Sequence, residues 1–276
     1  MEIKVWNMKI SILNENTVYK RGLIAEHGLS LLIETDNKRI LFDMGQSFAF
    51  TYNADKMNIS LEGLDAIVIS HGHYDHTGGL EYLVKSNQKL PNIYVQEEAF
   101  FEKKNGEKNI GIPWNIEEFR DNIVYVSEKE EIFQNIYLIS NIPYYTDFER
   151  VSSKFKKIKY GKIVEDDMIE EQVLVIEKEE GLFVFAGCSH RGIINILKHV
   201  NKIFNGKHIC FLIAGMHLIS SNNEYIQRTI DELKKIDIDK IIPLHCTGPI
   251  AISRIQAEFK DKCEMVETGQ IISLLV

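Results

Sequence analysis

The chain has few cysteines, no long apolar segment and no excess of positive charge, and each absence excludes a class of protein. Its four cysteines are scattered over the last third and do not form the framework of a disulfide-rich secreted domain. No apolar run approaches the roughly 20 residues that a membrane helix requires. The formal net charge of −8 argues against general binding to nucleic acid. We therefore expect a cytoplasmic protein with free thiols that binds neither membranes nor nucleic acid.

The length and patterning of the chain predict one α/β domain. Its 276 residues are 45% hydrophobic, enough for a large core, and no linker divides them, so we expect a single domain over 1–276. Short apolar bursts near the start are typical of strands, and strand and helix patterns alternate from residue 172 onward. Two sheets covered by helices are expected. Residues 97–104 are predicted as a short helix, and the polar stretch at about 105–170 as an insertion or lid.

The most informative segment is 70–79, which places four metal-ligand side chains within six residues directly after the apolar stretch 64–69. His71 and His73 are two residues apart, so at a strand end both can point to the same side. Asp75 and His76 follow as the chain turns and can face a second cation. A single histidine would more readily be a hydrogen-bonded surface or core residue. Together, these donors predict one or two zinc ions, with iron, manganese or nickel as alternatives.

Three further histidines, His190, His217 and His245, each follow a predicted strand in the second half of the chain. Because open α/β folds bind ligands at the carboxyl ends of strands, these side chains can converge on the segment at 71–76. The alternative, for His190 and His217, is that they cap a helix or bond a carbonyl. His27, His199 and His208 lack such surroundings, and we expect structural roles for them.

Two other residues at strand ends are candidates with open alternatives. Cys188 is either a small buried apolar residue or a ligand between two metal ions. Asp43 is either an N-cap or turn residue before Gly45, or an acceptor for the second ring nitrogen of a ligand histidine.

The segments 43–45, His71-x-His73-x-Asp75-His76 and the late His245 together resemble the metallo-β-lactamase superfamily. The segments 187–190, 215–218 and 245–248 resemble its branch labelled dihydropterin-ribofuranosyl-aminobenzene-phosphate synthase. The resemblance implies an αββα four-layer sandwich with a dinuclear site. It further implies that His71 and His73 bind the first metal, and Asp75, His76 and His245 the second.

The chain departs from the superfamily pattern in two places. No histidine lies between His76 and His190, where the pattern has a middle ligand, and Cys188 stands where the pattern has a bridging aspartate. Either His190 or His217 is expected to supply the missing ligand.

A site of this kind favours hydrolysis, because a bound metal makes hydroxide available at neutral pH. We expect Asp75 to orient the attacking water, and the substrate to be an ester, lactone, amide or phosphodiester. The alternative is a ligand- or metal-binding protein of the same fold with little catalytic activity. A redox diiron role is less favoured because no flavin module is visible.

A cluster of five lysines at 154–162 stands out in an otherwise acidic chain. It is either a solvated loop or a flap that attracts an anionic, phosphorylated or pterin-like small molecule. For the second case the candidate substrate contacts are Lys154, Lys156, Lys157 and Tyr145.

Overall fold

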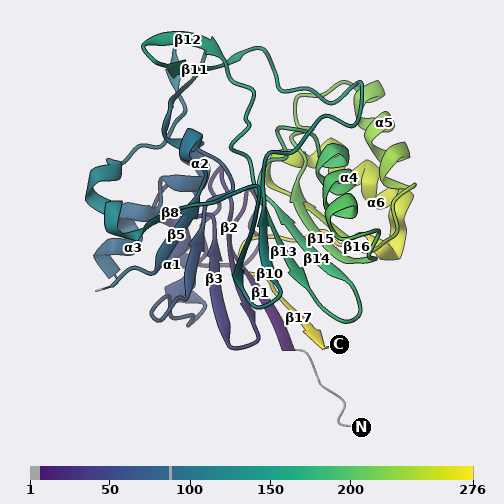
Figure 1. Cartoon of the computed structure of the whole chain (residues 1–276). Coiled ribbons are helices and arrows are strands. Elements are labelled where there is room, and N and C mark those ends of the chain that lie inside the picture. Colours follow the sequence, from purple (N-terminus) through teal and green to yellow (C-terminus); the bar gives the residue numbers. More distant parts are fainter. Residues whose placement is uncertain (1–6, 87–88, 276) are drawn as a thin grey trace.

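The computed structural model describes residues 7–86 and 89–275, and two facing β-sheets form its centre (Figure 1). The first sheet has the strand order β17-β1-β2-β3-β4-β5-β8. Strands β3, β4, β5 and β8 run parallel to one another, whereas β17, β1, β2 and β3 pair antiparallel. The strands are β1 (Asn7–Asn14), β2 (Ser30–Thr35), β3 (Lys38–Phe42), β4 (Ala66–Val68), β5 (Asn92–Val95), β8 (Ile123–Tyr125) and β17 (Ile271–Leu275).

The second sheet has the order β16-β15-β14-β13-β10-β9. Its last three strands in chain order, β14 to β16, are parallel, so their carboxyl ends lie at the same edge. The strands are β9 (Lys129–Phe133), β10 (Ile136–Ile139), β13 (Val173–Glu177), β14 (Leu182–Ala186), β15 (Ile209–Gly215) and β16 (Ile238–Leu244).

The central strands of the second sheet, β13, β14 and β15, are buried on both faces, which explains why they are nearly continuous apolar runs rather than alternating ones. In β2, Leu31 faces the core between the sheets, while Leu32 faces the outer helices. In β14, Phe183 faces the central core and Val184 the opposite side. Because successive side chains on a strand point to opposite faces, each strand contributes to two of the three cores.

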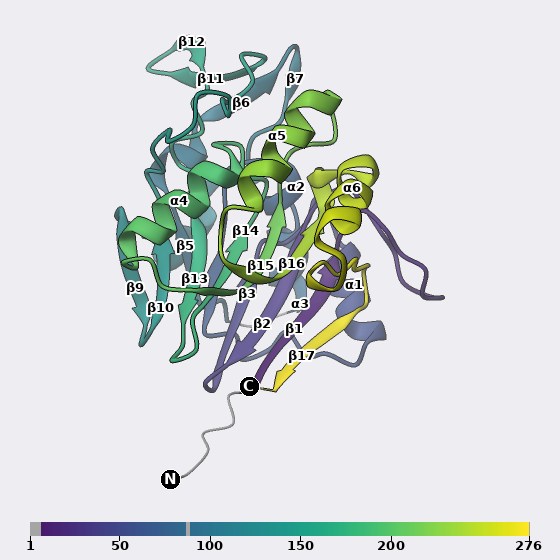
Figure 2. The same ribbon diagram turned by 90° about the vertical axis from the view of Figure 1, so that its right-hand side faces the viewer.

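Helices cover the two outer faces (Figures 1 and 2). α1 (Ala49–Lys56) and α3 (Leu80–Ser86) pack on the first sheet, and α4 (Ile193–Ile203), α5 (Asn223–Leu233) and α6 (Pro249–Phe259) on the second. The apolar residues of α4 recur three and four positions apart, which buries one stripe of that helix. The structure thus confirms the expected four-layer αββα sandwich. Among the described residues, no helix combines the length and apolar character needed to cross a bilayer.

The segment 97–104 is not the helix that we expected. A single turn, η1 (Glu97–Phe100), is followed by strand β6 (Glu102–Asn105), which pairs with β11 (Phe155–Lys159). β11 in turn pairs with β12 (Lys162–Glu165), so the lysine-rich segment is a hairpin. With β7 (Lys108–Asn109) these strands form a four-stranded sheet, here called the cap sheet, above the edge of the sandwich in Figure 1. The remainder of 105–170 includes β8, β9 and β10, which belong to the two main sheets.

A buried ion cluster ties the cap sheet to the segment that leads into β13. The Lys103 side chain of β6 is fully buried, and its Nζ lies 2.6 Å from Oδ2 of Asp166 and 2.7 Å from Oε1 of Glu170. Burial acts to lower the pKa of Lys103, but the two carboxylates outweigh it and raise that pKa. Lys103 therefore keeps its charge. Removing it leaves the buried Glu170 without its cationic partner and leaves Asp166, among the described residues, with only Lys157, at 3.7 Å, and the backbone NH of Met168. Breaking a buried ion pair in this way is costly.

We predict that Lys103→Met lowers the free energy of unfolding by about 3–5 kcal/mol in urea denaturation at pH 7. The adjacent Lys104 is the matched control, because its ion pair with Glu102 is partly exposed. Lys104→Met is expected to change stability by about 1 kcal/mol or less. The deficit of Lys103→Met should shrink at lower pH as the buried carboxylates take up protons. Equal effects of the two substitutions would contradict the anchoring role of Lys103.

Candidate metal centre

Strands from both sheets end at the edge of the sandwich beneath the cap sheet, and the residues that follow them form the candidate site. β3 is followed by Asp43, β14 by Cys188 and His190, β15 by His217 and β16 by His245. The segment 70–77 follows β4 and ends in the short helix α2 (Tyr74–Thr77). Parallel pairing within each sheet places these strand ends together, so side chains from five different parts of the chain meet.

The backbone leaves these strands through strained turns. Asp43, Ser189, His217 and His245 all have a positive φ, between 49° and 57°. Left-handed conformations disfavour residues with a Cβ and persist where the surrounding structure holds them, as it often does at functional sites. Four of them at one edge make this region a candidate for a functional site.

The first group of donors consists of His71, His73 and His190. One ring nitrogen from each lies within 4.8 Å of the others, and Nε2 of His71 lies 3.1 Å from Nδ1 of His73. Nε2 of His190 is buried and has no hydrogen-bond partner among the described residues. A buried imidazole nitrogen without a partner is costly. A metal ion among the three rings would satisfy it.

The second group consists of Asp75, His76 and His245. Nε2 of His76 lies 3.2 Å from Nε2 of His245, and Oδ2 of Asp75 lies 3.7 Å and 3.5 Å from these two nitrogens. Ligands at 2.0–2.1 Å from a tetrahedral zinc ion are about 3.3 Å apart. The spacing of this group is therefore close to that of a zinc coordination shell.

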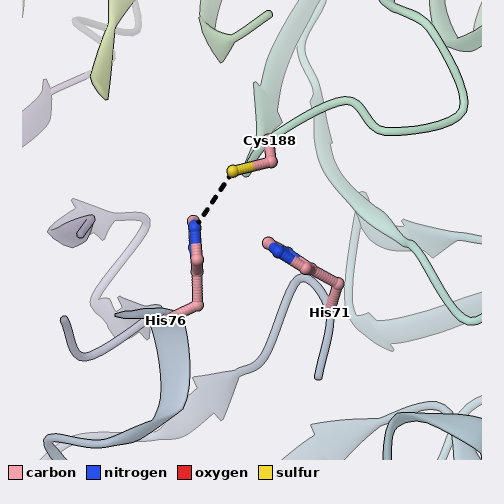
Figure 3. A group of neighbouring side chains, drawn as sticks. All are labelled: His71, His76 and Cys188. Atoms are coloured by element: carbon pink, nitrogen blue, oxygen red, sulfur yellow. Dashed lines mark hydrogen bonds between the residues drawn. The ribbon is translucent and has the colours of Figure 1, made fainter. Parts of the chain in front are cut away.

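Cys188 lies beside both groups. Its Sγ is 3.2 Å from Nε2 of His76, and the donor atoms of His71, His76 and Cys188 lie within 4.8 Å of one another (Figure 3). In Figure 3 the two imidazole rings and the thiol point toward a common space, although the histidines come from the segment after β4 and the cysteine from the end of β14. The sulfur atom thus occupies a position from which it can contact a cation in either group.

Asp43 fixes which ring nitrogens face that space. Its Oδ2 accepts hydrogen bonds from Nδ1 of His76 at 2.6 Å and from Oγ of Ser70 at 2.7 Å. Because the Ser70 hydroxyl donates to Asp43, its oxygen accepts from Nδ1 of His71, at 2.9 Å. Both histidines therefore carry a proton on Nδ1 and turn Nε2 toward the site. This is the hydrogen-bonding role considered for Asp43 from its place at a strand end.

The facing lone pairs of the second group require a positive charge between them. Nδ1 of His245 donates to Oδ1 of Asn16 at 2.8 Å, so Nε2 of His245 faces Nε2 of His76. Two lone pairs at this distance beside a carboxylate repel one another unless a proton or a metal ion lies between them. Burial acts to lower the pKa of His76, but the carboxylates of Asp43 and Asp75 outweigh it and raise that pKa to about 9. In the metal-free protein, a proton on His76 fills this role.

The first group has the opposite electrostatics. Burial and the neighbouring histidines hold the pKa of His71 well below its usual range, and burial lowers the pKa of His73 to about 3. Burial, followed by the charges of neighbouring histidines, also lowers the pKa of His190. These three rings are neutral at pH 7, which is the form of imidazole that binds a metal. Donor chemistry and spacing in both groups therefore fit divalent cations.

His217 and His27 flank the two groups on different sides. The His217 ring lies 4.3 Å from that of His190, and its donor atom groups with those of Cys188 and His190. His27, for which we expected a structural role, places Nε2 3.2 Å from Oδ2 of Asp75. The hydrogen bond from Leu29 N to the Asp75 carbonyl brings this turn to the site, and Gly28 packs so closely on the same carbonyl that a Cβ would lie 2.4 Å from it. A glycine directly after His27 was the only sequence signal for this approach.

The other two histidines in question are outside the site. Nδ1 of His199 bonds the hydroxyl of Tyr145, and His208 bonds Asp237 and Asp239 near the surface. The structural roles expected for these histidines agree with their contacts.

The four residues considered for substrate binding have different surroundings in the structure. Lys157 is nearly buried and pairs with Glu98 and Asp167, Lys156 pairs with Glu165, and the Tyr145 hydroxyl bonds His199. These three side chains have protein partners instead of facing a ligand. Lys154 differs, because it lines a cavity next to the candidate metal groups. A second cavity of about 250 Å³ lies directly over those groups, and its lining includes His73, Asp75, Cys188, His190, His217 and His245.

Comparison with known sequences agrees with this geometry. The family model described as the metallo-beta-lactamase superfamily matches residues 23–190. An uncharacterised protein of Methanocaldococcus jannaschii is 34% identical over 89% of this chain and 93% of its own length. A second protein of that organism, named 7,8-dihydropterin-6-methyl-4-(beta-D-ribofuranosyl)-aminobenzene-5'-phosphate synthase, is 34% identical over 98% of this chain and 97% of its own.

Comparison with solved structures gives the same assignment. The structure of Tm1679, described as a metal-dependent hydrolase of the beta-lactamase superfamily, is 31% identical and covers 98% of this chain and 100% of its own, with a TM-score of 0.85. The metallo-beta-lactamase fold protein YhfI from Bacillus subtilis, at 13% identity and a TM-score of 0.61, shares the fold. The αββα sandwich, the family match and these relatives together show that the chain belongs to the metallo-β-lactamase superfamily.

Proposed function

We propose that the protein is a metal-dependent hydrolase that binds two divalent cations, most suitably zinc, and acts on a small anionic molecule. One observation carries the proposal: two groups of three donors, His71, His73 and His190 beside Asp75, His76 and His245, lie next to each other under one cavity. One or more donors of each group line that cavity. We assign the first cation to the all-histidine group and the second to the group with the carboxylate. The mixture of imidazole and carboxylate is the donor set that zinc prefers.

Such a cation lowers the pKa of a coordinated water from 15.7 to about 7 and polarises the bond under attack. The chain's own residues then position the reactants. Asp75 reaches into the cavity with a carboxylate that accepts hydrogen bonds, and we assign to it the orientation of the attacking water. Asp43 lies behind His71 and His76 and holds their rings in the tautomer that binds a cation. No protein nucleophile is needed for an ester, lactone, amide or phosphodiester substrate.

The substrate class and the compartment complete the proposal. The small anionic substrate, phosphorylated or pterin-like, is consistent with the printed name of one relative, which describes a pterin-linked ribofuranosyl phosphate. A reducing compartment, the cytoplasm, is consistent with four free cysteines, of which Cys188 and Cys246 lie at the site.

We predict that His73→Ala and Asp75→Ala each reduce bound metal, measured by inductively coupled plasma mass spectrometry. We also expect a loss of about a thousandfold or more in metal-dependent hydrolysis across ester, lactone and phosphodiester substrates. The control is His208→Ala, since His208 bonds Asp237 and Asp239 away from the site. Wild-type protein that holds no stoichiometric metal, or that binds metal without any turnover on these substrates, would refute the hydrolase proposal.

We predict that Asp43→Asn weakens metal binding by about 10- to 100-fold and reduces the protons released on binding at pH 7. The sign follows from His76, whose pKa of about 9 means that a metal must displace its proton. Removing the Asp43 charge lowers that pKa, so fewer protons remain to be displaced.

Calorimetric titration in two buffers of different ionisation enthalpy measures this release. Asp55→Asn, an exposed change on α1, is the control. Proton release that is the same in Asp43→Asn and wild-type protein would contradict the role assigned to Asp43.

A further inference from the structure

The cavity that Lys154 lines, of about 370 Å³, adjoins the cavity over the metal groups and is here called the outer cavity. The two cavities share five lining residues, so a ligand can extend from one into the other: Asn105, Phe155, His190, His217 and Ser220. Phe155 of the cap sheet lies over the junction, with its ring 5.3 Å from that of His190 and 5.9 Å from that of His217. The outer cavity therefore lies where the remote part of a substrate would lie if its reacting bond were at the metals.

The outer cavity is positively charged, although the chain as a whole carries a formal net charge of −8. Arg150 and Lys154 line it, and no aspartate or glutamate belongs to its lining. Ser152, Ser220 and Ser221 also line this cavity. Two cations and three hydroxyl groups without a counter-charge favour an anion with several acceptor oxygens.

Arg150 is held in place without being neutralised. Its Nη1 donates to the backbone carbonyls of Thr146 and Glu149, both at 2.6 Å, and its guanidinium lies 4.5 Å from the ring centroid of Tyr144. Within residues 7–86 and 89–275 it forms no ion pair with a carboxylate. A guanidinium fixed by neutral groups keeps its charge and other N–H donors for a ligand, and loses little freedom on binding one.

Lys154 resembles Arg150 in lacking a carboxylate partner, and this distinguishes it from its neighbours in the lysine cluster. Lys156, Lys157 and Lys159 all pair with carboxylates. In the part of the chain that the structure describes, no ion pair of Lys154 is found, and this side chain lines the cavity. Lys162 lies on the exposed strand β12 and is not part of that lining. Of the lysines from the cluster, we therefore assign Lys154 to ligand binding.

We propose that the outer cavity binds a phosphate monoester carried by the substrate, through Arg150 and Lys154, while the bond to be hydrolysed lies over the metal groups. The inference rests on the proposed hydrolytic function and names its substrate class. A phosphate monoester has close to two negative charges at neutral pH and three acceptor oxygens, which matches two cations and adjacent hydroxyl groups. A carboxylate offers one charge and two oxygens. The cavity is larger than one phosphate group, so it also holds the organic part that bears it.

The test is calorimetric titration of the zinc-loaded protein with glycerol 3-phosphate, glycerate and glycerol, which differ in carrying a phosphate, a carboxylate or neither. We expect glycerol 3-phosphate to bind most tightly. Arg150→Gln and Lys154→Gln should each weaken that binding by about tenfold or more, as for loss of a charge-assisted hydrogen bond. Lys162→Gln is the matched control and should stay within about twofold of wild-type protein. Arg150→Lys keeps the charge and should lose less than Arg150→Gln.

Metal content measured on the same samples separates this proposal from the function on which it rests. Arg150→Gln and Lys154→Gln should retain the wild-type amount of zinc, whereas His73→Ala should not. Unchanged phosphate binding in both zinc-loaded variants would overturn the proposal, because the phosphate would then lie on the metals or elsewhere. Equal binding of glycerate, or no binding of glycerol 3-phosphate at about 10 mM, would overturn it as well.

Discussion

The carboxylate of Asp43 is the constraint on which the site depends. It accepts a hydrogen bond from His76 and another from Ser70, and through Ser70 it also determines the tautomer of His71. One buried acceptor therefore orients donors for both candidate cations, and in the metal-free protein its charge also keeps His76 protonated. The backbone NH of Ser70 donates to the other oxygen of Asp43, which ties the strand end of β3 to that of β4. Ligand orientation and strand pairing at this edge are thus a single network.

The four-layer architecture explains why a site assembled from distant segments can be precise. Side chains that bind a metal must be held to within a fraction of an ångström, and strands with both faces buried are rigid supports. The first sheet supplies the segment 70–77 and Asp43, and the second supplies Cys188, His190, His217 and His245. The central core between the sheets, which includes Phe42 and Phe185, fixes the distance between these two sets. The metal groups lie where the sheets meet, at the edge covered by the cap sheet.

The sequence predicted the parts of the site that depend on local spacing or on strand ends. His71, His73, Asp75 and His76 follow one strand, and His190 and His245 follow strands whose apolar runs, such as Leu182–Ala186, are continuous enough to recognise. His27 was missed because a turn brings it to Asp75 through tertiary contacts of Gly28 and Leu29. The cap strands β6, β11 and β12 were missed because charged side chains make up half or more of each strand. The pairing of β6 with β11, and ionic partners such as Glu98 for Lys157, join segments about 50 residues or more apart, so no short-range pattern reveals them.

The left-handed turns at the ends of β3, β14, β15 and β16 have a thermodynamic consequence. A residue with a Cβ in this conformation costs about 1–2 kcal/mol, so four of them store several kcal/mol that the apolar cores must offset. Ions that bind only the folded form stabilise it by mass action. If the proposed cations bind in this way, the thermal stability of the protein would rise with their free concentration, and metal depletion would favour its unfolding and proteolysis.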